Sequence, residues 1–194
     1  MYEKPFGGQS IDFRPDISDR LEFGHWEIDC VVGKREGKST CLMTLVERKT
    51  RYGISVLIPK RSKKCIVNAL KKVKSLFGKY FYQMFQSITA DNGPEFTNRF
   101  TTHREKPTLF QKHLEAHGIR HKVIRPFTPR HNGKVERSHR KDNERFYATH
   151  LFYSFEDFAK QLKRYNRRDY NNFPMRPLGW RTPNEVLLNY LHSL

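Results

Sequence analysis

The first pattern in the chain is an alternation of apolar and polar residues from His25 to Val32. This period of two predicts a β-strand with one buried and one polar face. Two further runs rich in β-prone residues follow, Ser39 to Glu47 and Tyr52 to Ile58. Only short polar stretches, 33–38 and 48–51, separate the three runs. Consecutive strands with such short connections are predicted to form an antiparallel meander.

The middle of the chain changes to the period of an α-helix. Apolar residues recur at helical spacing behind Ser62, which predicts an amphipathic helix that begins after that serine. Residues 87–90 predict a short fourth strand, and residues 119–124 predict a fifth. Between these two strands we expect a helical stretch from about 95 to 117, interrupted near Pro107.

The last third of the chain is predicted to be helical. One helix is expected to start at Asn132 and to run towards Tyr147. Two later helices are indicated by capping signatures, Ser154-Phe155-Glu156-Asp157 and Thr182-Pro183-Asn184-Glu185. The order of elements predicts an α/β fold, a mixed five-stranded sheet flanked by helices.

We divide the chain into three parts. Residues 1–20 are polar and contain proline and glycine, which is typical of an arm or linker. Residues 21–150 hold the predicted sheet and form the core domain. Residues 151–194 form a C-terminal helical extension that is expected to pack on the core.

Composition restricts the class of protein. No run of 18 apolar residues occurs, so no membrane-spanning helix and no membrane partner are predicted. The first ten residues lack the apolar stretch of a signal peptide. The three cysteines have no CxxC spacing and are expected to be reduced, mostly buried thiols. Together these features indicate a cytoplasmic protein.

Charge changes this picture further, because 37 Lys and Arg residues stand against 20 acids, a net charge of +17. The stretch from Arg120 to Arg181 alone holds sixteen basic residues and six acids. Aromatic residues such as Tyr170 and Trp180 lie among them, and they either belong to the core or stack on unpaired bases. A surplus of this size favours binding to the phosphates of nucleic acid over a mere contribution to solubility.

Three blocks of sequence place acids next to strand, turn and helix signals. They are Trp26-Glu27-Ile28-Asp29, Asp91-Asn92-Gly93-Pro94-Glu95-Phe96 and Pro126-Phe127-Thr128-Pro129-Arg130-His131-Asn132-Gly133-Lys134-Val135-Glu136-Arg137. Occurring in this order, they resemble the integrase core of bacterial insertion-sequence transposases, in the retroviral integrase superfamily. The resemblance extends from about residue 24 to 188. It implies a ribonuclease H-like fold and an active site of the DDE type.

The resemblance implies that Asp29, Asp91 and Glu136 are both the catalytic and the metal-binding residues. Three carboxylates suit phosphodiester exchange, because two Mg²⁺ (or Mn²⁺) ions can activate a hydroxyl nucleophile and neutralise the phosphate. Asp91 is expected to bridge the two ions. The implied activity is that of a polynucleotidyl transferase, which cleaves DNA and transfers strands during transposition and integration. Element ends and target DNA would be its partners, and a homodimer on DNA in the bacterial nucleoid is expected.

Residues around the triad carry further expectations. Candidates for contacts with DNA are Lys134, Arg137, Arg140 and Lys141. Asn92 and Glu95 are expected to position Asp91 or the DNA, although a turn and the first turn of a helix explain them nearly as well.

The chain departs from the family pattern in three places. Asn143 stands where many relatives carry Lys or Arg. Asp91 and Glu136 are forty-five positions apart, which is longer than usual, and we assign the excess to an insertion over 101–109. A complete N-terminal helix-turn-helix domain is not found, so we expect a core fragment or a truncated reading frame.

Other interpretations of the same residues stay open. Each acid alone is equally well explained as a surface, turn or helix-start carboxylate. The fold is compatible with a ribonuclease H-like nuclease that only hydrolyses, or with an inactive DNA-binding remnant of a transposase. His113 and His117 have the spacing of a metal pair, but a third ligand is not evident, and zinc is not expected.

Overall fold

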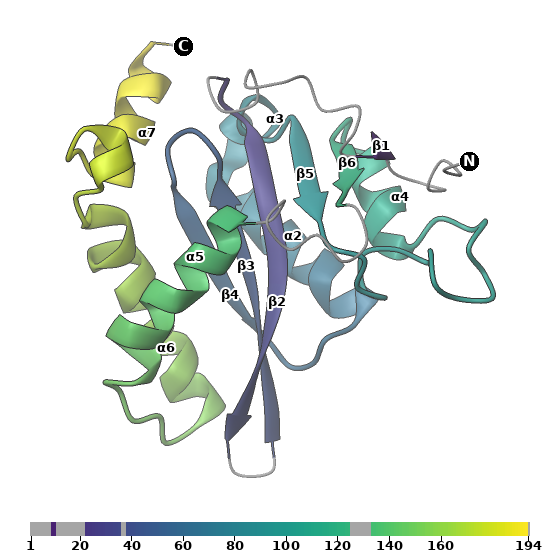
Figure 1. Cartoon of the computed structure of the whole chain (residues 1–194), viewed down its shortest axis with the longest axis horizontal. Coiled ribbons are helices and arrows are strands. Elements are labelled where there is room, and N and C mark those ends of the chain that lie inside the picture. The colour runs from purple at the N-terminus through teal and green to yellow at the C-terminus, as the bar shows by residue number, and fades with distance from the viewer. Residues whose placement is uncertain (1–8, 11–21, 36–37, 125–132, 194) are drawn as a thin grey trace.

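The centre of the molecule is a mixed sheet of six strands in the order β1-β6-β5-β2-β3-β4 (Figure 1). The computed structural model describes residues 9–10, 22–35, 38–124 and 133–193. The strands are β1 (Gln9–Ser10), β2 (His25–Arg35), β3 (Lys38–Glu47), β4 (Gly53–Ile58), β5 (Ser87–Ala90) and β6 (Arg120–Val123).

The pairing of the strands confirms the predicted meander. Strands β2, β3 and β4 are antiparallel neighbours, whereas β5 runs parallel to both β2 and β6. All five predicted strands are present. A sixth, β1, lies within the stretch interpreted as an arm and pairs Gln9 with Lys122 and Ser10 with Val123. The other residues of 1–20 lie outside the described residues.

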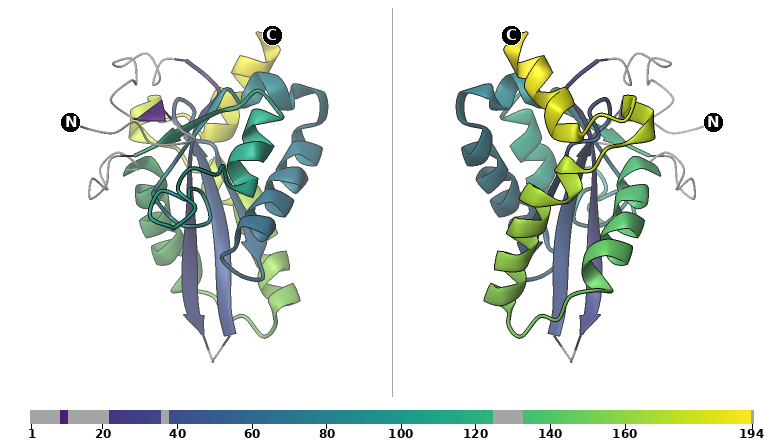
Figure 2. Two further views of the ribbon diagram at one scale, coloured as in Figure 1. Left: turned by 90° about the vertical axis from the view of Figure 1, so that its right-hand side faces the viewer. Right: turned by 90° about the vertical axis from the view of Figure 1, so that its left-hand side faces the viewer.

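Helices cover both faces of this sheet. They are α2 (Lys63–Phe77), α3 (Phe81–Met84), α4 (Leu109–Glu115), α5 (Gly133–Asp142), α6 (Phe155–Arg168) and α7 (Pro183–His192). Shorter helical segments lie between them. They are the 3₁₀ helices η2 (Gly78–Tyr80), η5 (Tyr170–Asn172) and η6 (Arg176–Leu178) and the π-helix η4 (Asn143–Tyr147). Figure 2 shows α2 and α5 on opposite sides of the sheet. Helix α5 contacts β2 and β3, and α6 contacts β4. No helix in this described part of the chain is long and apolar enough to cross a membrane.

The capping predictions hold for three helices, one of them in part. Ser62 accepts a hydrogen bond from the N–H of Cys65, and a reciprocal capping box joins Thr182 and Glu185. At α6, Ser154 accepts from the N–H of Asp157, while the Asp157 carboxylate accepts from the N–H of Tyr153. The box at α6 is therefore displaced by one residue. The predicted cap Asn132 lies outside the described residues.

The helical stretch predicted from about 95 to 117 is largely wrong. Only α4 forms there, and residues 95–108 are turns and irregular backbone. Polar side chains bond the main chain in this loop, since Asn98 donates to the carbonyl of Lys106 and Thr108 to that of Phe96. Such bonds compete with helix formation. Helix α4 starts only at the capping box of Thr108 and Gln111, directly after Pro107.

Two apolar clusters lie on the two sides of the sheet. The first surrounds Trp26 and Ile28 of β2, which face α2, and the Trp26 ring stacks on Phe85 at 4.5 Å. The second joins Leu42 and Leu57 of the meander to Phe146, Leu162, Tyr165 and the segment 170–178. Because neighbouring residues of β2 point to opposite faces, His25, Glu27 and Asp29 lie on the α5 side. This face of β2 carries the polar chemistry.

Candidate active site

Two of the predicted acids are neighbours, Asp29 within β2 and Asp91 directly after the parallel strand β5. Ile28 of β2 pairs with Ala90 of β5, so the next residues along the two strands, Asp29 and Asp91, lie side by side. Their side chains are 22% and 34% exposed, so a substrate can reach both. The Asp29 carboxylate accepts from the N–H of Cys30 at 2.7 Å and lies 3.5 Å from Nδ1 of His139 on α5.

The loop after β5 orients Asp91. Its carboxylate accepts from the N–H of Gly93 at 2.9 Å and lies 4.0 Å from the guanidinium of Arg61. Arg61 also makes an ion pair with the buried Glu95. A Cβ on Gly93 would lie 2.8–2.9 Å from side-chain atoms of Asp91, Glu95 and Arg61, so only glycine permits this convergence. Asn92 donates to the carbonyl of Ile124 at 3.0 Å and joins the loop to the end of β6.

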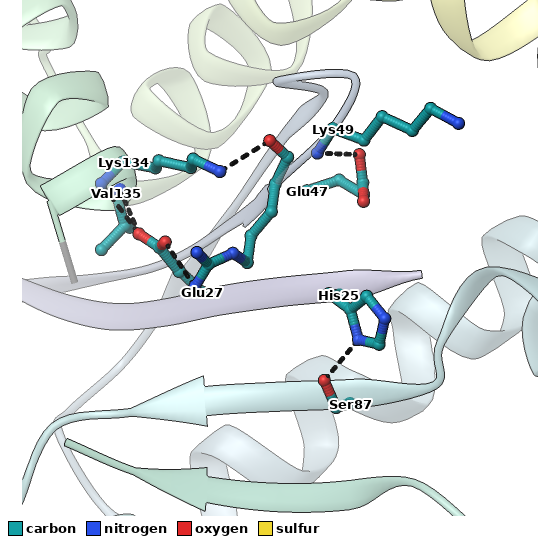
Figure 3. Close-up of polar contacts among 8 residues, drawn as sticks. His25, Glu27, Glu47, Lys49, Ser87, Lys134 and Val135 are labelled. Carbon is teal, nitrogen blue, oxygen red and sulfur yellow. Dashed lines mark hydrogen bonds and ion pairs between the residues drawn. The ribbon is translucent and has the colours of Figure 1, made fainter. Parts of the chain in front are cut away.

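Glu136 is exposed in the first turn of α5, and the start of this helix is held by β2. The buried carboxylate of Glu27 accepts from the N–H of Lys134 at 2.8 Å and from that of Val135 at 3.1 Å (Figure 3). It also lies 3.4 Å from the buried guanidinium of Arg48. The first N–H groups of a helix have no partner within the helix and carry partial positive charge. Glu27 supplies that partner and thereby places Glu136 near Asp29.

The three predicted acids influence one another in series. Burial is the main reason why the pKa of Asp29 is raised, and the charge of Asp91 raises it further, against the opposing effects of the Cys30 N–H and Arg61. Burial also raises the pKa of Glu136, followed by the charges of Asp29 and Glu27. The charge of Asp91 thus acts on Asp29, and the charge of Asp29 acts on Glu136. Carboxylates that repel one another in this way are a donor set suited to a hard divalent cation.

The side chains of Asp29, Asp91 and Glu136 do not converge on a common point in this structure. Within the described ranges, no three His, Cys, Asp or Glu side chains stand close enough together to hold a metal ion. In this arrangement Asp91 lies beside Arg61, and Asp29 lies beside His139. Burial lowers the pKa of His139 to about 4, so at neutral pH the ring is uncharged and its contact with Asp29 is not an ion pair. The donor chemistry fits a divalent cation.

The four predicted DNA-binding residues line one groove. This α5 groove lies between α5 and the segment 170–180 and has a volume of about 570 Å³. Lys134, Arg137, Arg140 and Lys141 form part of its α5 wall, and Glu136 lines it as well. The ammonium of Lys134 also donates to the carbonyl of Arg48 at 2.8 Å. The predicted DNA contacts and one predicted catalytic acid thus share a surface.

The histidine pair lies elsewhere. The rings of His113 and His117 on and after α4 are 4.5 Å apart, and Nδ1 of His117 is 2.8 Å from the carbonyl oxygen of His113. Burial lowers the pKa of His113 to about 4. These contacts at the C-terminal end of α4 account for both histidines without a metal ion.

Comparison with known proteins gives the family. A sequence profile described as integrase core domain matches residues 19–129, and a second profile of the same description matches residues 117–183. The chain belongs to the integrase core domain family. It is 33% identical over 188 residues to the transposase for insertion sequence element IS4351 of Bacteroides fragilis, which covers 92% of this chain and 49% of that protein.

Two other relatives are named as a transposase and an integrase. The chain is 37% identical over 92 residues to the probable transposase for insertion-like sequence element IS1161 of Streptococcus salivarius, covering 47% of this chain and 25% of the relative. It is 28% identical over 154 residues to the putative integrase ORF3 of Spiroplasma virus SpV1-C74, covering 77% and 41%. This integrase core therefore spans a quarter to a half of the length of these relatives.

Solved structures show the same fold. The catalytic core domain of BIV integrase superposes with a TM-score of 0.58 at 19% identity, covering 89% of this chain and 98% of that one. The catalytic core domain of HTLV-2 integrase, in complex with magnesium, gives a TM-score of 0.55 at 18% identity, covering 84% and 95%. The ribonuclease H-like fold expected from the sequence is confirmed.

Sequence reasoning missed three residues of this integrase core. In the sequence Glu27 appears only as part of a motif, and no pattern singles out Arg61 or His139. A signal for Glu27 existed, because it lies two residues before Asp29 and therefore on the same face of the predicted strand. Arg61 and His139 carry no such local signal, since they reach the site from the loop before α2 and from the middle of α5.

Proposed function

We propose that this integrase core is the catalytic part of a DDE transposase, a polynucleotidyl transferase that cleaves DNA and joins strands with divalent metal. Asp29, Asp91 and Glu136 are the proposed catalytic and metal-binding residues. The observation that carries the proposal is the adjacency of Asp29, within β2, and Asp91, directly after the parallel strand β5, with Glu136 close enough for Asp29 to raise its pKa. Neighbouring carboxylates with raised pKa values are candidates for a functional site.

When bound, two Mg²⁺ or Mn²⁺ ions would supply an activated hydroxyl and neutralise the charge at phosphorus. The chain's own residues provide the frame for this chemistry. Asp29, Asp91 and Glu136 would hold the ions, with Asp91 as the proposed shared ligand. Glu27 positions the helix that carries Glu136, and Arg61 and Gly93 orient Asp91.

The substrate in this proposal is DNA, both the ends of a mobile element and a target. The names of the relatives support this, since two of them are transposases of insertion sequences. A chain of the simian T-cell lymphotropic virus intasome has the same fold, with a TM-score of 0.58 at 16% identity. Joining two element ends requires two active sites, so we also propose that the chain forms a homodimer on DNA.

The experiment that tests this function uses a labelled branched duplex that mimics the product of strand transfer. Because the reaction is reversible in principle, an active core should cut and rejoin this DNA with Mg²⁺ or Mn²⁺ but not with EDTA. Asp91→Asn should abolish the reaction, because the amide cannot replace the carboxylate as a ligand. Glu115→Gln, an exposed acid on α4 outside both the triad and the α5 groove, serves as the control and should stay active.

The products separate the proposal from its alternatives. Rejoined strands support a transposase, whereas nicking without joining would point to a nuclease that only hydrolyses. Binding of DNA without any metal-dependent chemistry would point to an inactive remnant. Equal activity of Asp91→Asn and the wild type would overturn the assignment of the active site.

A further inference from the structure

The α5 groove carries an excess of positive charge that the proposed chemistry of the three acids does not explain. Two acids, Glu136 and Glu144, line the groove. The lining cations are Arg51, Lys134, Arg137, Arg140, Lys141 and Arg176. Burial lowers the pKa of Lys141, and the charges of Arg145, Arg137 and Arg51 lower it further. The cations of the groove thus repel one another, and a bound polyanion would reduce this repulsion.

The wall opposite α5 carries an exposed tryptophan on a constrained turn. The Trp180 side chain is 71% exposed and follows Gly179, and both residues have positive φ, 63° and 64°. A bulky residue in this region of backbone space is a real outlier, and such outliers gather at functional sites. Two main-chain hydrogen bonds hold the turn, from Trp180 to Met175 at 3.1 Å and from Met175 to Arg181 at 3.0 Å.

The base of this turn is part of the second apolar cluster. Met175 and Leu178 are buried there beside Tyr165 of α6. The turn is therefore anchored to the core, and Trp180 is held at the rim of the groove without being needed for its packing. In the described ranges, no aromatic or cationic side chain lies against the Trp180 ring. Phe173 differs, because the guanidinium of Arg145 lies 3.6 Å from its ring centroid.

Cations along one wall and an unoccupied aromatic face on the other match the requirements of a single nucleic-acid strand. Phosphates bind to basic side chains without regard to sequence, and an unpaired base can stack on an indole ring. A base inside a duplex is already stacked on its neighbours and is not available to a rigid tryptophan. A volume of about 570 Å³ is of the size that small-molecule sites have, which is enough for a nucleotide-sized group.

We propose that the α5 groove binds an unpaired DNA strand beside the scissile phosphate, with one base stacked on Trp180 and the phosphates on Arg137, Arg140 and Lys141. The proposal rests on the proposed function, because Glu136 lines the same groove and relates it to the reacting phosphodiester. The groove thereby selects DNA whose strands have separated near the site of cleavage. Trp180 is a binding residue in this account and not a catalytic one.

The chain offers its own probe for this idea, since it contains two tryptophans. Trp26 is fully buried, and its indole N–H donates to the carbonyl of Met84 at 2.6 Å. Its emission should not respond to DNA and reports that the protein is folded. The emission of Trp180 should be quenched when a base stacks on it. The titration is done in EDTA, so that binding is measured without any cleavage.

Three DNA probes are titrated in parallel, a thymidine oligonucleotide, a fully paired duplex, and the same duplex with an unpaired flap. We expect the single strand and the flap to quench the wild type, and the duplex to leave its emission nearly unchanged. Trp180→Phe should lose the quenching but keep most of the affinity, because the ring remains. Trp180→Ala should bind the flap about 5- to 150-fold more weakly. Tyr153→Ala, which removes an 87% exposed ring outside the groove, is the matched control and should bind like the wild type.

Several results would overturn the proposal. They are equal quenching by the paired duplex, no quenching by any probe, or wild-type affinity of Trp180→Ala for the flap. Quenching that grows with protein concentration in the absence of DNA would instead assign the turn to contacts between copies of the chain. If these tests fail while Asp91-dependent joining persists, the groove proposal alone falls. If Trp180 is quenched but joining is absent, the proposed function is the part that fails.

Discussion

The carboxylate of Glu27 accepts a hydrogen bond from the backbone N–H of Lys134 at 2.8 Å, across 107 positions of sequence. This bond joins strand β2, which carries Asp29, to the first turn of α5, which carries Glu136. Glu27 is 2% exposed, and so it is a buried acid whose charge is balanced by the helix start and by Arg48. The relative placement of two proposed catalytic acids thus depends on Glu27, an acid outside the proposed triad.

Replacing Glu27 tests this dependence. Glu27→Gln should lower the free energy of unfolding by about 1–3 kcal/mol, because the amide accepts weaker bonds and Arg48 loses its buried counter-charge. Urea unfolding followed by circular dichroism measures the loss. The same substitution at Glu22, whose side chain is 62% exposed, should change stability by less than about 0.5 kcal/mol. If the two variants are equally stable, Glu27 does not hold α5.

Gly93 should be more important for function than for stability. In Gly93→Ala the new methyl would meet Asp91, Glu95 and Arg61, whose side chains can move aside only by leaving their present arrangement. We expect strand joining to fall at least about tenfold, a change of about 1.4 kcal/mol, with little change in unfolding. Gly133→Ala adds the same methyl where no described atom lies within 4 Å and is the control. Normal joining by Gly93→Ala would contradict this view of the loop.

Asp142 should make stability depend on pH. Burial raises its pKa to about 6, although Tyr165 donates to it at 3.0 Å. An acid with a raised pKa in the folded state favours folding when it is protonated. Its stabilising contribution is therefore present below about pH 4 and is lost as the pH rises through about 6. The melting temperature of the wild type should fall, relative to Asp142→Asn, between pH 5 and 7. A constant difference between the two proteins over that range would contradict the raised pKa.

Salt should reveal the phosphate contacts of the α5 groove. Arg137 and Arg140 are exposed on its wall, and each phosphate contact releases condensed counterions when DNA binds. Replacing either arginine by glutamine should weaken the binding of the flapped duplex and reduce the slope of log affinity against log salt by about 1. Fluorescence anisotropy between about 50 and 200 mM salt measures this slope. Lys163→Gln, exposed on α6 outside the groove, should leave the slope nearly unchanged. Equal slopes for all three variants and the wild type would exclude these contacts.

Much of the sheet could be predicted because its signals are local. The alternation in His25–Val32 and the short connections after it are sufficient for a meander, and both are properties of neighbouring residues. The loop over 95–108 could not be predicted in this way, since its path depends on side chains such as Asn98 and Thr108 that bond the main chain several residues away. A helical pattern is visible in the sequence there, but the competing bonds are not.

The candidate site also contains residues that the sequence could predict and residues that it could not. Asp29 and Asp91 are visible in the sequence because one lies on a predicted strand and the other directly after one, each in a motif, whereas the role of Glu27 appears only when α5 docks on β2. Arg61 likewise becomes part of the site only when the loop before α2 meets the loop after β5. That Asp91 bridges the two ions stays a prediction, since spacing along the chain contains no information on which acid two ions would share.

The central claim is that three carboxylates from distant parts of the chain hold divalent metal together. Binding of Mn²⁺ without DNA, followed by electron paramagnetic resonance, tests it most directly. Asp29→Asn, Asp91→Asn and Glu136→Gln should each bind Mn²⁺ at least about tenfold more weakly than the wild type. Glu144→Gln should bind normally. If the three triad variants bind Mn²⁺ as tightly as the wild type, the acids do not form one metal site and the account is wrong.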